Sequence, residues 1–166
     1  MINKINKLPQ SEFIKVFANI FENSSWIAIE LYRQKPFGNI EDLSSKILDI
    51  FENITKEEQL KILNTHPDLA DKTKIGSLTT NSRNEQNNAG LDQCSEKEFE
   101  EFKNLNNKYK KKFGFPFICA VKDKEKKEIL SNFRQRVSCD INVEFEEAKK
   151  QVKKIASLRL NEINDK

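Results

Sequence analysis

Apolar residues recur at intervals of three and four along most of the chain, the spacing that places side chains on one face of an α-helix. The stripes fall within residues 13–21, 26–32, 40–51, 60–63, 99–113, 129–137 and 145–163. Only four Gly and four Pro occur, and this scarcity disfavours a turn-rich β-sandwich or barrel. The pattern predicts an all-α fold of about eight helices, in a single compact domain over residues 1–166.

Capping residues mark where several of these helices should begin. They are Asn39 and the pairs Thr55/Glu58, Ser82/Glu85 and Ser95/Glu98, each pair with the spacing of a capping box. Pro67 disfavours the α conformation at His66, so the helix opened by Thr55 should end at that point. Residues 70–80 have no regular pattern and are expected to form a loop.

Residues 115–121 form a continuous apolar run that contains Pro116 and is too short for a helix. We expect a short, buried, extended segment there. Such a segment ordinarily belongs to the core. If one side of its backbone were unpaired, its polar groups could instead hydrogen-bond a planar heterocycle.

Composition and charge narrow the class of protein. Apolar residues make up 37% and charged residues 33%, and the net charge is +3 with a pI near 8.6, so the excess of positive charge is small. The basic runs 108–112 and 122–127 lack interleaved aromatic residues, which favours solvated helix ends over a nucleic-acid site. The three cysteines form no CxxC pair, and no apolar run approaches the roughly 20 residues that span a membrane. We therefore expect a cytoplasmic protein that binds neither nucleic acid nor membrane.

Two side chains could carry chemistry. His66 is the only histidine, and it could either cap the C-terminus of a helix or move protons near neutral pH. Arg159 lies on the apolar stripe of the last helix, between Ile155 and Ile163, where a guanidinium needs an anion. It could reach out to water, pair with an internal carboxylate, or bind the carboxylate of a substrate. The Ser82/Glu85 spacing is explained by capping, although a helix N-terminus can also receive a polar ligand.

Several motifs in order resemble one known family. They are His66-Pro67-Asp68-Leu69-Ala70, Leu78-Thr79, Ser82-x-x-Glu85-Gln86-x-x-Ala89-Gly90-Leu91, the positions Phe99, Leu105, Asn106 and Tyr109, the run Lys112-Phe113-Gly114-Phe115-Pro116-Phe117-Ile118, and Ile155-Ala156-x-x-Arg159-Leu160. Trp26 and Arg33-x-x-Pro36-Phe37 fit as well. Over nearly the whole chain, the sequence closely resembles OHCU decarboxylase, where OHCU is 2-oxo-4-hydroxy-4-carboxy-5-ureidoimidazoline. The family usually continues the His-Pro motif with Ala-Gly-Lys, whereas Asp71 occupies the Gly position here.

The resemblance implies a carboxy-lyase of purine catabolism, an all-helical homodimer that converts the ureidoimidazoline to (S)-allantoin in urate degradation. It implies His66 as the catalytic acid–base and no metal or organic cofactor, and we expect Glu85 to assist His66. The residues expected to line the substrate site are Pro67, Ser82, Arg83, Asn84, Glu85, Gln86, Phe117, Ile118, Cys119, Ala120, Val121 and Arg159. Two alternatives remain open at this point: a relative that acts on another small carboxylated heterocycle, and a non-catalytic helical interaction module.

Overall fold

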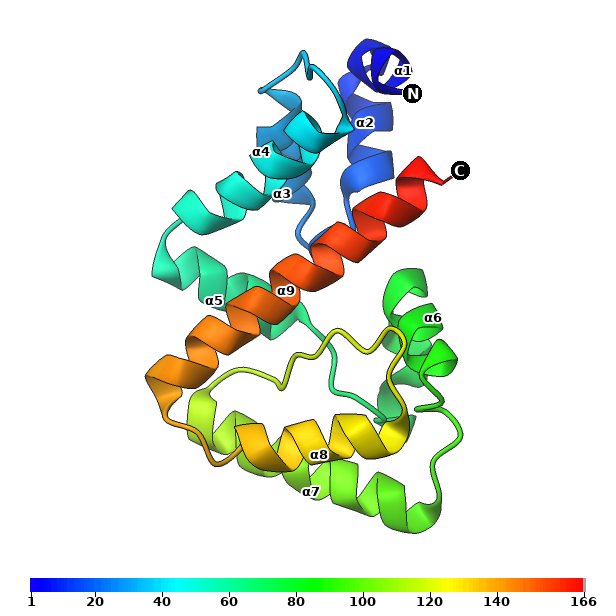
Figure 1. Ribbon diagram of the computed structural model, residues 1–166, viewed down its shortest axis with the longest axis vertical. Coiled ribbons are helices and arrows are strands. Elements are labelled where there is room, and N and C mark those ends of the chain that lie inside the picture. Colours follow the sequence, from blue (N-terminus) through cyan, green and yellow to red (C-terminus); the bar gives the residue numbers. More distant parts are fainter. Residues whose placement is uncertain (166) are drawn as a thin grey trace. The chain divides into compact units, whose positions relative to one another are not determined.

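The computed structural model describes residues 1–165 and is built from helices (Figure 1). In chain order the elements are α1 (Ile2–Lys7), α2 (Gln10–Phe17), α3 (Ser25–Tyr32), α4 (Ile40–Asn53), α5 (Lys56–Thr65), the 3₁₀ helix η1 (Lys72–Ser77), α6 (Thr80–Asn88), α7 (Glu96–Phe113), α8 (Lys126–Arg136) and α9 (Ile141–Asn164). No strand occurs within residues 1–165. The all-α prediction is confirmed, with α1 and η1 added to the expected helices.

The chain forms two compact units. The first contains Met1–Thr65 and the chain from Lys153 onward, and the second contains His66–Val152. Helix α9 therefore begins in the second unit and ends in the first. A single domain over 1–166 stays a prediction.

Most of the predicted helix starts are confirmed. The Asn39 side chain accepts from the Asp42 N–H at 2.7 Å, and both Thr55/Glu58 and Ser95/Glu98 form reciprocal capping bonds. Helix α5 ends at Thr65, one residue before His66. Helix α7 ends at Phe113, and its C-cap is Gly114, whose φ of +79° is a conformation that glycine adopts readily.

Two local predictions were wrong. Ser82 does not cap α6, because the cap is Thr79, whose hydroxyl accepts from the Ser82 N–H at 3.2 Å. Thr79 and Ser82 both carry a hydroxyl that can cap a helix. The helix begins after Thr79, the earlier of the two, so Ser82 and Glu85 lie inside it. The expected loop over 70–80 contains the 3₁₀ helix η1, which Asp71 caps.

The second unit has an aromatic core around α7 and α8. Phe117 and Phe133 stack with ring centroids 3.9 Å apart, and the Tyr109 ring meets both at near-perpendicular angles. Residues 115–121 are buried and extended, as predicted, and lie against these rings. The apolar segment is therefore fixed in place by the same aromatic side chains that join α7 to α8.

A buried charge network completes this core. Arg136, on α8, places Nε 2.7 Å and Nη2 2.5 Å from Glu144 Oε1, at the start of α9. The Tyr109 hydroxyl donates to the same oxygen at 2.5 Å, and Arg136 Nη1 donates to the Ile118 carbonyl at 2.6 Å. Burial, together with the hydrogen bond to Glu144, raises the pKa of the Tyr109 phenol, so it stays protonated as a donor. One guanidinium thus links α8, α9 and the extended segment.

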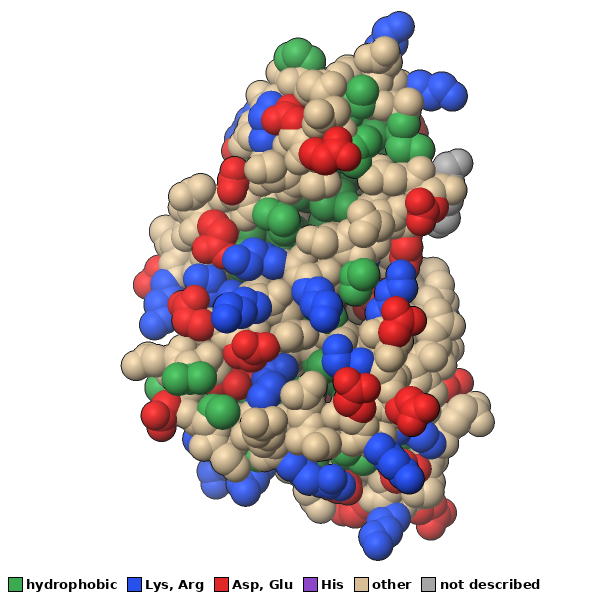
Figure 2. Space-filling view, viewed as in Figure 1, with side chains coloured by type: hydrophobic (Ala, Val, Ile, Leu, Met, Phe, Trp, Pro, Cys, Tyr) green, Lys and Arg blue, Asp and Glu red, His purple; other side chains and the backbone are tan. Residues whose placement is uncertain are grey.

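The charged surface is mixed, as the sequence predicted. Figure 2 shows Lys and Arg side chains interspersed with Asp and Glu over the face in view. Within residues 1–165, no helix is both long enough and apolar enough to cross a bilayer.

Replacing Glu144 by Ala should destabilise the protein by about 3–5 kcal/mol, because Arg136 would remain buried without its anion. Urea unfolding measures the free-energy change. Arg134→Ala on α8, the helix of Arg136, is the control, since the Arg134–Glu101 pair has a similar distance of 2.5 Å but is solvent-exposed. A loss for Glu144→Ala no larger than that of the control would contradict the role given to the buried pair.

Candidate active site

The His66 side chain lies at the entry to an irregular stretch of the second unit. His66 follows α5 directly and is 8% exposed. Pro67 and the next three residues turn the chain toward η1, and Ala70 has a φ of +54°, an uncommon value for a residue with a Cβ. The only imidazole of the chain is therefore carried by backbone that belongs to no helix.

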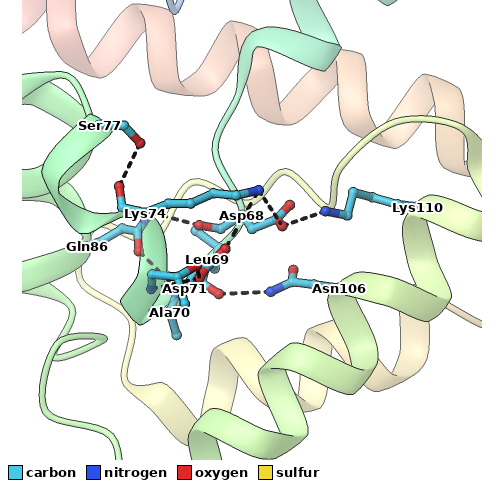
Figure 3. Close-up of polar contacts among 10 residues, drawn as sticks. Asp68, Leu69, Ala70, Asp71, Lys74, Ser77, Gln86, Asn106 and Lys110 are labelled. Carbon is cyan, nitrogen blue, oxygen red and sulfur yellow. Dashed lines mark hydrogen bonds and ion pairs between the residues drawn. The ribbon is translucent and has the colours of Figure 1, made fainter.

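Side chains from α6 and α7 hold this backbone (Figure 3). Gln86 donates from Nε2 to the Asp68 carbonyl at 3.2 Å and accepts at Oε1 from the Ala70 N–H at 3.1 Å. Asn106 donates from Nδ2 to the Leu69 carbonyl at 3.0 Å. Lys110 Nζ lies 2.6 Å from the Asp68 carboxylate. We call the side chains of Gln86, Asn106 and Lys110 the clasp.

Helix α6 carries the other predicted residues near this stretch. Ser82 and Gln86 are buried and one turn apart, and Glu85 is half-buried beside them. Arg83 and Asn84 are exposed, on another side of the helix. Of these residues, Gln86 is hydrogen-bonded directly to the stretch that follows His66. Both ends of its amide bond the protein backbone.

The predicted backbone site at 117–121 makes several bonds inside the second unit. The Ile118 carbonyl accepts from Arg136, and the Ala120 N–H donates to Gln151 Oε1 at 2.9 Å. The Ala120 carbonyl accepts from Lys124 Nζ at 3.1 Å. These groups serve to fix the segment, and substrate contacts by Phe117, Cys119 and Val121 stay a prediction.

Arg159 lies in the first unit and has an internal partner. Its Nη2 is 2.9 Å from Glu22 Oε2, and its Nη1 donates to the Asn19 carbonyl at 2.7 Å. Both charged side chains are 2% exposed. Of the alternatives left open by the sequence, pairing with an internal carboxylate is confirmed. A substrate contact by Arg159 stays a prediction.

Sequence reasoning did not identify the partners of these groups. Glu22 was not singled out because it directly follows Phe21 at the end of a stripe. Arg136 and Glu144 did lie at helical spacing from buried apolar residues: Arg136 is three residues after Phe133, and Glu144 is four before Ala148. Asn106 has the same signal, since it lies on the α7 stripe four residues after Phe102.

A cleft of about 520 Å³ opens between η1 and α7. Its described lining residues include Asp68, Asn106 and Lys110 but none of the positions 82–86 and 117–121. Among residues 1–165, no group of three or more His, Cys, Asp or Glu side chains could hold a metal ion. The cleft is therefore bordered by Asn106 and Lys110 of the clasp.

Asp71, at the position where the family usually has Gly, has a structural role. Its carboxylate accepts from the Thr73 N–H at 3.0 Å and from the Thr73 hydroxyl at 2.7 Å, which caps η1. Partial burial alone would raise the pKa of Asp71, but the hydrogen bonds from Thr73, together with the charges of Lys74 and Lys110, outweigh it and lower the pKa. The φ of Asp71 is −92°, so this position does not need glycine.

Comparison with known proteins identifies the family. The profile described as OHCU decarboxylase matches residues 6–161. A 2-oxo-4-hydroxy-4-carboxy-5-ureidoimidazoline decarboxylase of Haloferax volcanii is 36% identical over 161 residues, 97% of this chain and 94% of that protein. A relative of the same name from Xenopus laevis is 35% identical over 96% of this chain and 91% of its own length. The chain belongs to the OHCU decarboxylase family.

Longer relatives and solved structures agree with this assignment. A uric acid degradation bifunctional protein of Bacillus sp. (strain TB-90) is 39% identical over 98% of this chain, which spans only 32% of that protein. A crystal structure of (S)-allantoin synthase has a TM-score of 0.80 at 27% identity, covering 98% of this chain and 53% of that chain. A crystal structure of OHCU decarboxylase in the presence of (S)-allantoin has a TM-score of 0.72 at 23% identity, which supports the fold. It covers 89% of this chain and 96% of that chain.

Replacing Asp71 by Ala should lower the free energy of unfolding by about 1 kcal/mol at neutral pH, the usual cost of losing an N-cap. Because the pKa of Asp71 is lowered by folding, the contribution of its charge is present above the unfolded pKa of about 3.9 and is lost as the pH falls through the folded pKa. The difference between wild type and Asp71→Ala, measured by urea unfolding, should therefore shrink in acid. Asp71→Asn keeps an acceptor for Thr73 and is the control. A difference that grows in acid would contradict this assignment.

Proposed function

We propose that this protein catalyses the decarboxylation of 2-oxo-4-hydroxy-4-carboxy-5-ureidoimidazoline to (S)-allantoin, a carboxy-lyase step of urate degradation. The observation that carries the proposal is the match to decarboxylases of similar length, at 36% identity over 97% of this chain in the Haloferax relative. The (S) configuration is supported by the likeness to the solved (S)-allantoin synthase. The sequence retains the His-Pro motif directly after α5.

The chemistry of this substrate explains how side chains alone could suffice. Loss of carbon dioxide breaks a C–C bond and leaves its electron pair on the ring carbon that also bears the hydroxyl. The pair forms a double bond to the adjacent ring carbon, whose C=N electrons pass to the ring nitrogen, and that nitrogen takes up a proton to give an enol. The adjacent carbon then takes up a proton, while the hydroxyl loses its proton and becomes a carbonyl. The substrate supplies its own electron acceptor, so the protein needs to orient it and to move protons.

His66 is the residue to which we assign the proton transfer. An imidazole ordinarily titrates near pH 6.5, so both of its protonation states are accessible at neutral pH. The burial of His66, 8% exposed, favours delivery of the proton to one face of the enol. Single-face delivery would give one enantiomer of the product.

Helix α6 supplies the polar groups that we assign to substrate orientation. Glu85 would orient the imidazole or a ureido N–H, and Ser82 would hydrogen-bond the ring. Backbone groups of 117–121 that are not engaged by Arg136, Gln151 or Lys124 would fix the ureido arm.

We also propose, from the family likeness, that the protein is a cytoplasmic homodimer. The exposed aliphatic side chains of Ile141 and Val143 at the start of α9 are consistent with a contact surface.

Replacing His66 by Asn should lower the rate of formation of optically active allantoin by about 10²- to 10⁴-fold, the usual contribution of a general acid–base. The unstable substrate is generated in situ from urate with the two preceding activities, and circular dichroism follows the product. Uncatalysed decay gives no net optical activity, so it does not mask the result.

Lys111→Met, at an exposed position of α7, is the control and should leave the rate unchanged. An unaltered rate in His66→Asn would remove His66 from the mechanism. If the wild type does not accelerate the reaction but is stabilised against heat by allantoin, the protein is a relative with another carboxylated heterocycle as substrate. Neither acceleration nor stabilisation would favour an interaction module.

A further inference from the structure

The backbone of residues 68–70 is held by side chains that come from two helices. The Asp68 carbonyl, the Leu69 carbonyl and the Ala70 N–H each have a side-chain partner in the clasp. A buried irregular segment must satisfy its polar groups in some such way, because no helix or strand does so for it. Three consecutive residues are therefore fixed from outside the segment.

Gln86 holds this segment with both ends of its amide. Its oxygen accepts from Ala70, the residue with the positive φ, and its nitrogen donates to Asp68. A left-handed conformation at a residue with a Cβ costs free energy and persists only where the surroundings hold it. The two bonds from Gln86 supply such a restraint.

Asn106 is retained at a cost. The residue is 4% exposed, and its Oδ1 is buried with no hydrogen-bond partner. A buried unpaired acceptor is unfavourable, so the amide is a poor choice for packing alone. The other end of the amide bonds the Leu69 carbonyl, and in Figure 3 Nδ2 points at that carbonyl while Oδ1 points away from it. The Asn106 side chain therefore fixes the position of the Leu69 backbone.

Lys110 adds an ionic contact one turn further along α7. Its Nζ is 2.6 Å from the Asp68 carboxylate, whose side chain is 9% exposed. Lys74 of η1 is a more distant second cation, 3.9 Å from the same oxygen. The Asp68 side chain is thereby held between α7 and η1.

We propose that Gln86, Asn106 and Lys110 are positioning residues that set the imidazole of His66 by fixing residues 68–70. Only Pro67 separates His66 from the clasped segment, and its ring locks φ, so few soft dihedral angles remain between them. A small displacement of the segment is therefore passed on to the imidazole. The proposal rests on the catalytic role given to His66 above, and it gives Gln86 a role other than binding substrate.

Asn106→Leu tests the proposal with little change in volume. The substitution removes one buried unpaired acceptor and leaves the Leu69 carbonyl without the Asn106 donor, so stability should change little. We expect kcat to fall about 10- to 100-fold with KM unchanged, the effect of a catalytic group displaced by about 1 Å. Gln86→Leu should have the same signature.

The single histidine provides a direct readout of position. His66 gives the only imidazole Cε1–H signal of the chain in a ¹H–¹³C spectrum, so it needs no assignment by mutation. We expect this signal to shift or broaden in Asn106→Leu and in Lys110→Met. Lys110→Arg retains the ion pair and should restore both the signal and kcat, and Lys111→Met on the same helix is the matched control.

The outcomes separate this proposal from the function on which it rests. A His66 signal that does not move in Asn106→Leu overturns the positioning role, whatever the rate. A signal that moves while kcat stays at the wild-type value, in a protein that His66→Asn inactivates, overturns the catalytic consequence of the clasp. If His66→Asn itself is fully active, the catalytic assignment fails, and the signal still decides whether the clasp fixes the imidazole.

Discussion

Hydrogen bonds between side chains and the backbone of residues 68–70 are the interaction on which the candidate site depends. This short stretch lies between α5 and η1, outside both, and it carries the chain away from His66. Gln86 and Asn106 replace the missing ladder of backbone bonds, and Lys110 holds Asp68 by charge. The irregular backbone can then be as well defined as a helix, which a catalytic side chain requires.

Helix α7 joins this clasp to the rest of the second unit. Asn106 and Lys110, one turn apart, face the clasped segment, while Tyr109 between them donates to Glu144. Glu144 in turn fixes Arg136, which holds the Ile118 carbonyl. Helix α7 therefore helps to position residues 68–70, through amide and ammonium groups, and residues 117–121, through a buried ion pair. A displacement of α7 would therefore move both residues 68–70 and residues 117–121.

Local signals in the sequence predicted the helices. The partners of buried polar side chains could not be predicted, because they lie far away along the chain. Asn39 and Ser95 act on residues three positions away, so their caps could be recognised directly. The Thr79 cap was missed because an equivalent spacing at Ser82 competes with it. Arg159 was recognised as a charge in an apolar stripe, but its partner Glu22 is distant in sequence and has no periodic pattern. Polar residues on apolar stripes are the signal for such buried contacts, and Asn106 carries the same signal.

The clasp makes an irregular segment rigid, and amide hydrogen exchange at Ala70 is the most direct test of that rigidity. The Ala70 N–H belongs to no helix, and its hydrogen-bond acceptor is the side chain of Gln86. We expect slow exchange of this amide in the wild-type protein and fast exchange in Gln86→Leu, at a temperature where both remain folded. Exchange at Ala70 as fast as that of an unprotected amide in the wild type would contradict it.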